Sequence, residues 1–247
     1  MANHNPQPRV SWNSQQTAPS GCSVCPTRHR CPADGLNENG LAVMSTCMRV
    51  SENMNRGDYL YREGDRADRC YVVRSGVFKT YTQNVMGDEY ITGFYYTGEL
   101  IGMNGQATGH HVDSAVALDT ATSCRLLIDD LPTLWAIGAG PGLLRMVGEQ
   151  QCAGFDQQIN LGQSKADARV AGFLVQLAER MRRLGRSDKG LPTPMSRTDL
   201  ANHLGMTLES LSRVLGRFKR AGLIGASRDQ IELHKPRELE TLACHLA

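Results

Sequence analysis

Residues 196–222 read SRTDLANHLGMTLESLSRVLGRFKRAG, a pattern that predicts two short helices joined by a tight turn. Gly205 permits the turn, because glycine adopts a left-handed backbone at no steric cost, and Thr207 can cap the second helix. Apolar residues recur at helical spacing, so we expect one face of each helix to lie inward. The residues expected on those inward faces are Leu200, Ala201, Leu204, Leu208, Leu211, Val214, Leu215 and Phe218.

The second helix is predicted to have a polar outer face that reads DNA. Its candidate DNA-contacting residues are Thr207, Glu209, Ser210, Ser212, Arg213 and Arg217. The N-terminal part of a recognition helix enters the major groove. There Arg213 offers a fork that matches guanine O6 and N7, Glu209 can accept a bond from cytosine N4, and Ser212 can bond a base or a phosphate. The alternative is a helical hairpin unrelated to DNA.

A hairpin wing is predicted after this motif and a helix before it. Residues 223–226 and 230–233 alternate as two short strands around a turn at residues 227–229. Residues 165–184 carry apolar side chains at helical spacing and end at the Gly185 break. We therefore expect residues 165–247 to form a winged helix-turn-helix DNA-binding domain.

Charge is divided unevenly along the chain. Residues 165–247 hold 15 Lys and Arg against 9 Asp and Glu, whereas residues 1–164 hold 12 against 16. A basic C-terminal part suits a polyanionic partner such as double-stranded DNA, because phosphate neutralisation supplies much of the affinity. The alternative is an ordinary solvated surface.

Short strands separated by glycine turns are predicted from about residue 50 to residue 127. Residues 70–76, 77–82 and 90–95 are examples in which β-branched or aromatic residues alternate with polar ones. We expect an antiparallel sensory β-roll over residues 41–140. Together with the predicted helices, it places the chain in the α+β class.

A long helix is predicted over residues 141–164. Its apolar residues, several of which share one face, are Leu143, Leu144, Met146, Val147, Phe155 and Ile159. A single helix that leaves a β-domain with a mixed apolar and polar stripe often pairs with its own copy, so we predict a dimerisation helix and a homodimer. The alternative is packing against its own domain.

The N-terminal segment, the apolar runs and the cysteine content indicate the cellular compartment in which the protein works. The polar leader lacks the basic start and apolar core of a secretory signal, and charged residues interrupt every long apolar run. We expect a cytoplasmic protein with no membrane partner. In a reducing cytosol, eight cysteines are better explained by metal binding, redox chemistry or burial than by disulfides.

Three of these cysteines form a C-x2-C-x5-C pattern at Cys22, Cys25 and Cys31, in a loop without helical or strand periodicity, within the leader segment 1–40. Burial in a core is not expected there. Thiolates are soft ligands that suit iron–sulfur clusters or zinc. The candidates for a fourth ligand are Cys47, Cys70, Cys124, Cys152 and Cys244, of which Cys70 and Cys152 have apolar neighbours typical of buried residues.

From Gly21 onward the chain resembles the FNR branch of the CRP-FNR regulators. The cysteine spacing matches, as do GDEYITGF at residues 87–94, TGHH at residues 108–111 and ESLSR at residues 209–213. The resemblance implies that Cys124 is the fourth ligand of a [4Fe-4S] cluster, in a β-roll of the cyclic-nucleotide-binding type. It further implies that the cluster favours dimerisation and binding to a palindromic promoter site without oxygen, and that oxygen destroys the cluster.

The resemblance also implies an exposed loop that contacts RNA polymerase, with Gly87 and Asp88 as its main residues and Ser75 and Thr120 as further candidates. No cyclic nucleotide is expected, because Asp113-Ser114 stand where such a sensor has Arg-Ser, and a carboxylate repels a phosphate. A regulator that senses another ligand, including haem through His110 or His111, is an alternative.

A zinc or thiol-redox DNA-binding protein is a further alternative, because four thiolates suit zinc as well as iron–sulfur clusters. No phosphate-binding loop, zinc-protease helix or nucleophile elbow is found in the sequence. The sequence therefore predicts a regulator and not an enzyme.

Overall fold

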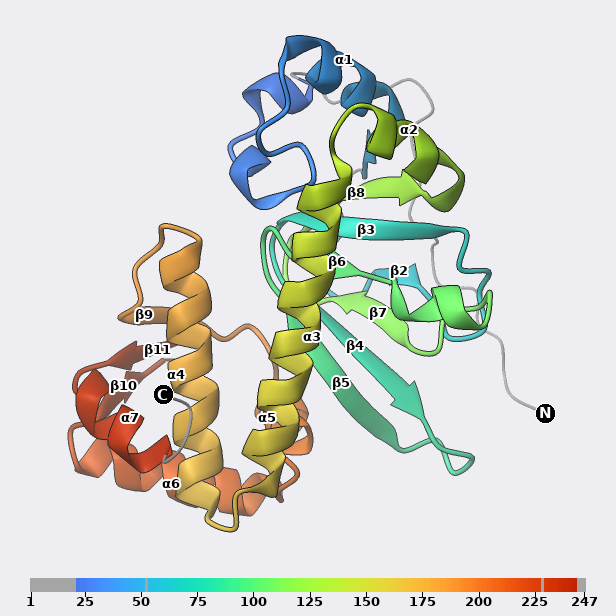
Figure 1. Ribbon diagram of the computed structural model, residues 1–247. Helices are drawn as coiled ribbons and strands as arrows, with labels where there is room; N and C mark the ends of the chain where they lie inside the picture. The colour runs from blue at the N-terminus through green and yellow to red at the C-terminus, as the bar shows by residue number, and fades with distance from the viewer. Residues whose placement is uncertain (1–20, 52, 228, 244–247) are drawn as a thin grey trace. The chain divides into compact units, whose positions relative to one another are not determined.

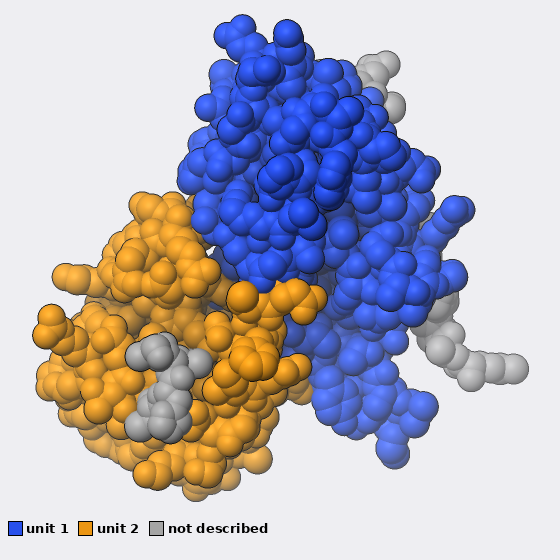
Figure 2. Space-filling view, in the orientation of Figure 1, with its two compact units in different colours: residues 1–150 blue, residues 151–247 orange. Residues whose placement is uncertain are grey.

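The computed structural model describes residues 21–51, 53–227 and 229–243. Two compact units divide the chain, residues 1–150 and residues 151–247 (Figure 2). Cys244 and the first half of the predicted leader, residues 1–20, lie outside the described residues. In the part of the chain that is described, no helix has the length and apolar character needed to cross a lipid bilayer.

Unit 1 is built on two antiparallel four-stranded sheets that form a β-roll (Figure 1). The first has the order β1 (Met48–Val50), β8 (Thr122–Leu127), β3 (Arg69–Ser75) and β6 (Leu100–Ile101). The second has the order β2 (Tyr59–Tyr61), β7 (Ser114–Ala117), β4 (Phe78–Gln83) and β5 (Glu89–Tyr95). The strands predicted over residues 70–76, 77–82 and 90–95 are thus confirmed as β3, β4 and β5.

The interior of the β-roll holds a buried carboxylate. Asp113 accepts hydrogen bonds from the Tyr61 hydroxyl at 2.9 Å and from the Asn104 amide at 3.0 Å. Burial raises the pKa of this carboxyl, and the hydrogen bonds partly oppose that shift. Buried His111 stacks on the Tyr61 ring with 3.6 Å between ring centroids, whereas His110 is exposed. The roll is therefore lined by a carboxylate and aromatic rings.

One end of the β-roll is covered by elements that the strand pattern did not predict. These are the turns η1 (Cys22–Val24) and η2 (Arg28–Arg30), and the helices α1 (Glu38–Cys47) and α2 (Leu131–Ala136), which lie beside the start of α3 (Gly140–Gly162) in Figure 1. The turns η3 (Asn104–Ala107) and η4 (Ile128–Asp130) complete the unit. Their apolar side chains share one core with the first sheet, and its members include Cys31, Leu41, Met44, Leu126, Leu134 and Met146.

Helix α3 confirms the predicted long helix but divides its apolar residues into two groups. Leu143 and Met146 are 2% exposed, and with half-buried Val147 they pack into the core of unit 1. Leu144, Phe155 and Ile159 are 60%, 64% and 36% exposed. Assigning Leu143 and Met146 to the dimer face is wrong, because the start of the helix packs against its own β-roll, which is the alternative weighed for this helix.

Unit 2 contains a winged helix-turn-helix. Its elements are α4 (Ala166–Arg183), β9 (Gly190–Pro192), α5 (Arg197–His203), α6 (Leu208–Arg220), β10 (Ile224–Ala226), β11 (Gln230–Leu233) and α7 (Pro236–Ala243). The predicted wing is confirmed as β10 and β11, and β9 adds a third strand beside β11. The core is formed by one face each of α4, α5 and α6, through residues such as Phe173, Leu177, Leu200, Leu211 and Phe218.

Candidate metal centre and nucleic-acid interface

The loop that carries the cysteine triplet is a series of tight backbone turns. The Cys25 N–H donates to the Cys22 carbonyl at 3.4 Å, and the Arg28 N–H donates to the Cys25 carbonyl at 3.1 Å. The Cys31 N–H then donates to the Arg28 carbonyl at 3.1 Å. These successive turns make the loop compact without the support of a regular α-helix.

Helix α1 holds the start of this loop. The Ser45 hydroxyl accepts a hydrogen bond from the Cys22 N–H at 2.9 Å and donates one to the Leu41 carbonyl at 2.8 Å. Cys31, in contrast, is anchored by burial: it is 9% exposed and belongs to the apolar core. The expectation that no cysteine of this loop would be buried is therefore wrong for Cys31, because the loop folds back onto α1 and α3.

Cys124 lies in the middle of the first sheet of unit 1. Strand β8 pairs with β1 and β3, and Cys124 stands opposite Val50 on one side and Val72 on the other. Side chains directly opposite one another project from the same face of an antiparallel sheet. This face carries Met48 and Val50, and the cysteine loop covers it at the same end of the β-roll.

The four sulfurs predicted as ligands influence one another electrostatically. Burial raises the pKa of Cys124 to about 12, and negative charge on Cys25, Cys22 or Cys31 raises it further, while Arg74 opposes the shift. Burial likewise raises the pKa of Cys31 to about 12, with smaller contributions from Cys22 and Cys25. Charge–charge interactions weaken with distance, so thiols that influence each other in this way lie in the same part of the site.

A cleft of about 320 Å³, part of it open to solvent, separates the loop from the sheet. It is lined by Gly21, Cys22, Cys25, Ser45, Met48, Val50, Arg74 and Cys124. Within the described ranges, no three His, Cys, Asp or Glu side chains are grouped so that they could hold a metal ion. Three soft thiols from two separate segments line this cleft, Cys22 and Cys25 of the loop and Cys124 of β8, and donors of this kind suit an iron–sulfur cluster.

The other cysteines have different surroundings. Cys47 is buried in the core beneath the loop, and Cys70 is fully buried in β3, where the sequence placed it. Cys152 is exposed on α3, so the expectation that it would be buried is wrong. That error arose because the apolar neighbours of Cys152 lie on the exposed half of α3.

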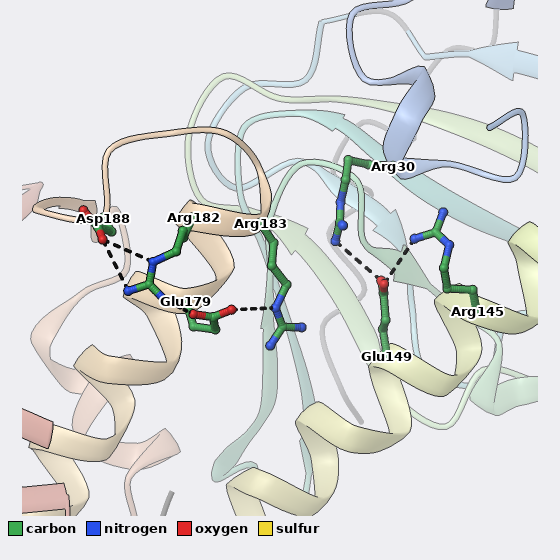
Figure 3. A network of polar contacts seen from close by, with 7 residues as sticks. All are labelled: Arg30, Arg145, Glu149, Glu179, Arg182, Arg183 and Asp188. Atoms are coloured by element: carbon green, nitrogen blue, oxygen red, sulfur yellow. Dashed lines mark hydrogen bonds and ion pairs between the residues drawn. The ribbon is translucent and has the colours of Figure 1, made fainter. Parts of the chain in front are cut away.

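Charged groups connect the cysteine loop with α3 inside unit 1 (Figure 3). Arg30 pairs with Glu149 at 3.5 Å, and Arg145 pairs with the same carboxylate at 3.1 Å. The backbones also meet, because a Cβ atom built on Gly142 would stand 3.1 Å from the Pro32 Cα atom. The residue before Cys31 and the residue after it therefore both contact the helix.

In unit 2 the recognition helix α6 is held in place by its cap and by its buried face. The Thr207 hydroxyl accepts a hydrogen bond from the Ser210 N–H at 3.1 Å, and Gly205 has a φ of 59° in the turn before it. Leu211, Val214, Leu215 and Phe218 are buried, as the sequence predicted. Leu208 is 45% exposed instead, because the first turn of α6 projects beyond the core.

The predicted DNA-contacting residues lie together on the opposite face of α6. Glu209, Ser212, Arg213 and Arg217 are exposed, and Ser210 is half-buried. Arg213 pairs with Glu209 at 3.0 Å, and Arg217 pairs with Asp167 of α4. Both guanidinium groups are thus oriented by carboxylates and still accessible to solvent, a suitable arrangement for contact with base edges and phosphates.

We expect Thr207→Ala to lower the stability of unit 2 by about 1 kcal/mol, since an N-cap that is lost leaves a backbone N–H without its partner. Thr207→Ser keeps the hydroxyl and should behave like the unchanged protein. Urea unfolding followed by circular dichroism at the helix band measures both variants. Equal loss in the Ser and Ala variants would show that the methyl group, and not the cap, stabilises α6.

The residues predicted to contact RNA polymerase are all exposed. Gly87 and Asp88 form the tip of the hairpin between β4 and β5, and Thr120 lies in the turn between β7 and β8. Ser75 ends β3, where its hydroxyl hydrogen-bonds with that of Thr122 at 2.7 Å. Exposed Val85 and Met86 adjoin Gly87 at the same hairpin tip.

Sequence reasoning missed Ser45, Arg74 and Glu149, which contact the cysteine loop or its cleft. Their elements come from distant parts of the chain, and no local spacing relates them to the cysteines. The signal that could have pointed to Arg74 is its position two residues after Val72 in a strand whose alternation was recognised.

Family models match the two units separately. Residues 51–136 match the cyclic nucleotide-binding domain, and residues 168–242 match the Crp-like helix-turn-helix domain. Among solved structures, FixK2 from Bradyrhizobium japonicum has a TM-score of 0.70 and 25% identity, covering 79% of this chain and 98% of that one. A CooA mutant from Carboxydothermus hydrogenoformans has a TM-score of 0.62 at 19% identity, covering 80% and 88%, and shows the fold alone.

Curated relatives match nearly the whole chain. The fumarate and nitrate reduction regulatory proteins of Salmonella typhi and of Escherichia coli K12 are each 32% identical to it, over 91% of this chain and 90% of theirs. These relatives are transcription regulators and not enzymes, and the matched Crp-like helix-turn-helix is a DNA-binding domain. The chain therefore belongs to the FNR branch of the CRP-FNR family of transcription regulators.

Proposed function

We propose that this regulator senses oxygen through a [4Fe-4S] cluster bound by Cys22, Cys25, Cys31 and Cys124. The observation that supports the proposal most directly is the position of Cys124. It lies far along the chain from the other three, yet its pKa responds to all three of them. Cys22, Cys25 and Cys124 line one cleft, and Cys31 interacts electrostatically with Cys124, so together they offer the four thiols that such a cluster requires.

The bound cluster would be the group that reacts with oxygen. The protein would couple the presence of the cluster to dimerisation. The loop has two routes to α3, the contact of Pro32 with Gly142 and the ion pair of Arg30 with Glu149. A loop held in place by four thiolates keeps both contacts, which fixes the start of α3. Only a difference in stability between the two states of the loop can shift the dimer equilibrium.

The homodimer would form through the exposed residues of α3, with Leu144, Phe155 and Ile159 at its centre. They are spaced by eleven and by four residues, so they lie near one face of a helix. This dimer surface lies on the predicted dimerisation helix but does not include Leu143 and Met146, because both are buried in the core of unit 1. Each partner would then present one α6 to one half of a palindromic promoter site.

Phe155→Ala is expected to weaken self-association of the cluster-containing protein by on the order of tenfold or more, because a large apolar side chain would no longer be buried in the interface. Sedimentation equilibrium under anaerobic conditions measures the dissociation constant. Val85→Ala, which trims an exposed apolar residue outside α3, serves as the control. An unchanged constant for Phe155→Ala would exclude this face as the dimer surface.

RNA polymerase would be the second macromolecular partner, contacted by the hairpin tip at Gly87 and Asp88 together with Ser75 and Thr120. Exposure of all four residues and the apolar pair Val85 and Met86 at that tip support this assignment. This contact with RNA polymerase would activate transcription at the promoter, and it would not alter the binding of the regulator to DNA.

Anaerobic purification with iron and sulfide analysis tests the cofactor. We expect about four irons and four sulfides per chain, a brown colour and loss of the visible absorption in air. A colourless protein with one zinc per chain would overturn the proposal in favour of a zinc-stabilised DNA-binding protein. Regulation by a cyclic nucleotide is disfavoured, because buried Asp113 would offer the phosphate a carboxyl group in the β-roll and not a cation.

A further inference from the structure

Arg74 lies on the wall of the cysteine cleft and has no assigned role. It lines the cleft together with Cys22, Cys25 and Cys124. Its strand, β3, is hydrogen-bonded to β8, which carries Cys124, and β1 lies on the other side of β8. On the side of the cleft formed by the sheet, Cys124 of β8 therefore lies between Met48 and Val50 of β1 and the guanidinium group of Arg74 of β3.

Arg74 lies at an irregularity in β3. The register of β3 with β8 shifts between Val73 and Ser75, so Arg74 is the residue at the irregularity. A bulge of this kind changes the direction of a side chain without ending the strand. Val72 stands directly opposite Cys124, and Arg74 follows it by two residues, toward the cleft.

The electrostatic surroundings of Arg74 are unusual for a half-buried arginine. Among the described residues it has no carboxylate partner, although arginines nearby, such as Arg30 and Arg145, are paired with Glu149. A cation without a counter-ion on the wall of a cleft is available to an anion inside it.

We propose that Arg74 is a positioning residue that compensates the negative charge of a centre bound by thiolates in the cysteine cleft. The inference rests on the proposed function, since it assigns a role toward the group that the cysteines would hold. A centre with four thiolate ligands carries net negative charge, and its reduced form carries one charge more. A neighbouring guanidinium stabilises both forms and stabilises the reduced form more strongly.

Two uncharged variants, Arg74→Gln and Arg74→Met, and the charged variant Arg74→Lys test this role in the full chain. The anaerobically prepared protein is titrated electrochemically for the midpoint potential of the cluster. Separately, the metal-free protein is titrated with Co²⁺, and the thiolate-to-cobalt absorption is followed. Arg49→Gln is the matched control, because Arg49 lies between Met48 and Val50 on β1 and therefore projects from the opposite face of the sheet.

We expect both uncharged variants to shift the midpoint potential to more negative values and to bind Co²⁺ severalfold more weakly. Arg74→Lys and Arg49→Gln should remain near the unchanged protein. Equal potentials and equal cobalt affinities in all variants would overturn the role of Arg74. If the unchanged protein binds Co²⁺ through thiolates but assembles no cluster, the proposed function fails, and the cobalt titration still decides the role of Arg74.

Discussion

Cys124→Ser is expected to abolish cluster assembly and, with it, oxygen-dependent DNA binding. A serine hydroxyl is a hard donor with a much higher pKa than a thiol, so it does not replace a thiolate ligand. The winged helix-turn-helix should stay folded, since Cys124 belongs to unit 1 and the core of unit 2 is separate. Iron and sulfide analysis after anaerobic purification measures the first effect, and gel-shift titration with and without air measures the second.

Cys152→Ser provides the control for this experiment. Cys152 is exposed on α3, so its replacement should leave the cluster content unchanged. Cys22→Ser should act like Cys124→Ser, because both sulfurs face the same cleft. A normal amount of iron and sulfide in the Cys124 variant would refute the ligand set.

Arg213→Ala should weaken binding to the specific promoter site by about 1–3 kcal/mol for each half-site, or roughly 5-fold to 150-fold, through loss of a bidentate contact with guanine. A dimer on a palindrome makes this contact twice, so the total loss is larger. The cluster should be unaffected, because Arg213 lies on α6 of unit 2. Gel-shift titration at one fixed salt concentration, on specific and unrelated DNA, measures the change in selectivity.

Arg182→Ala removes the same charge from unit 2 without touching α6. Arg182 pairs with Glu179 and with Asp188, the latter at 3.3 Å, near the end of α4 (Figure 3). Its loss should not alter the preference for specific DNA. If Arg213→Ala weakens binding to every sequence equally, Arg213 contacts phosphates and does not read bases.

Local signals in the sequence were sufficient for much of unit 2. Gly205 in the turn, Thr207 at the cap and the apolar spacing of α6 act within a few residues of one another, so each could be recognised without a structure. Strand β9 was missed because three residues carry too little periodicity and its pairing partner, β11, follows two helices later. The exposure of Leu208 was missed for a related reason, since periodicity does not reveal where a core ends.

For the candidate metal site, the sequence by itself identified the triplet Cys22, Cys25 and Cys31 as possible ligands, because these thiols are close along the chain, and it suggested Cys124 through family resemblance. Only the tertiary structure placed Cys124 and Arg74 on the same cleft. Their positions depend on β8 pairing with β1 and β3, strands that are separated by long stretches of chain. Such pairing is stabilised by the whole β-roll and its core, so no local pattern could specify it.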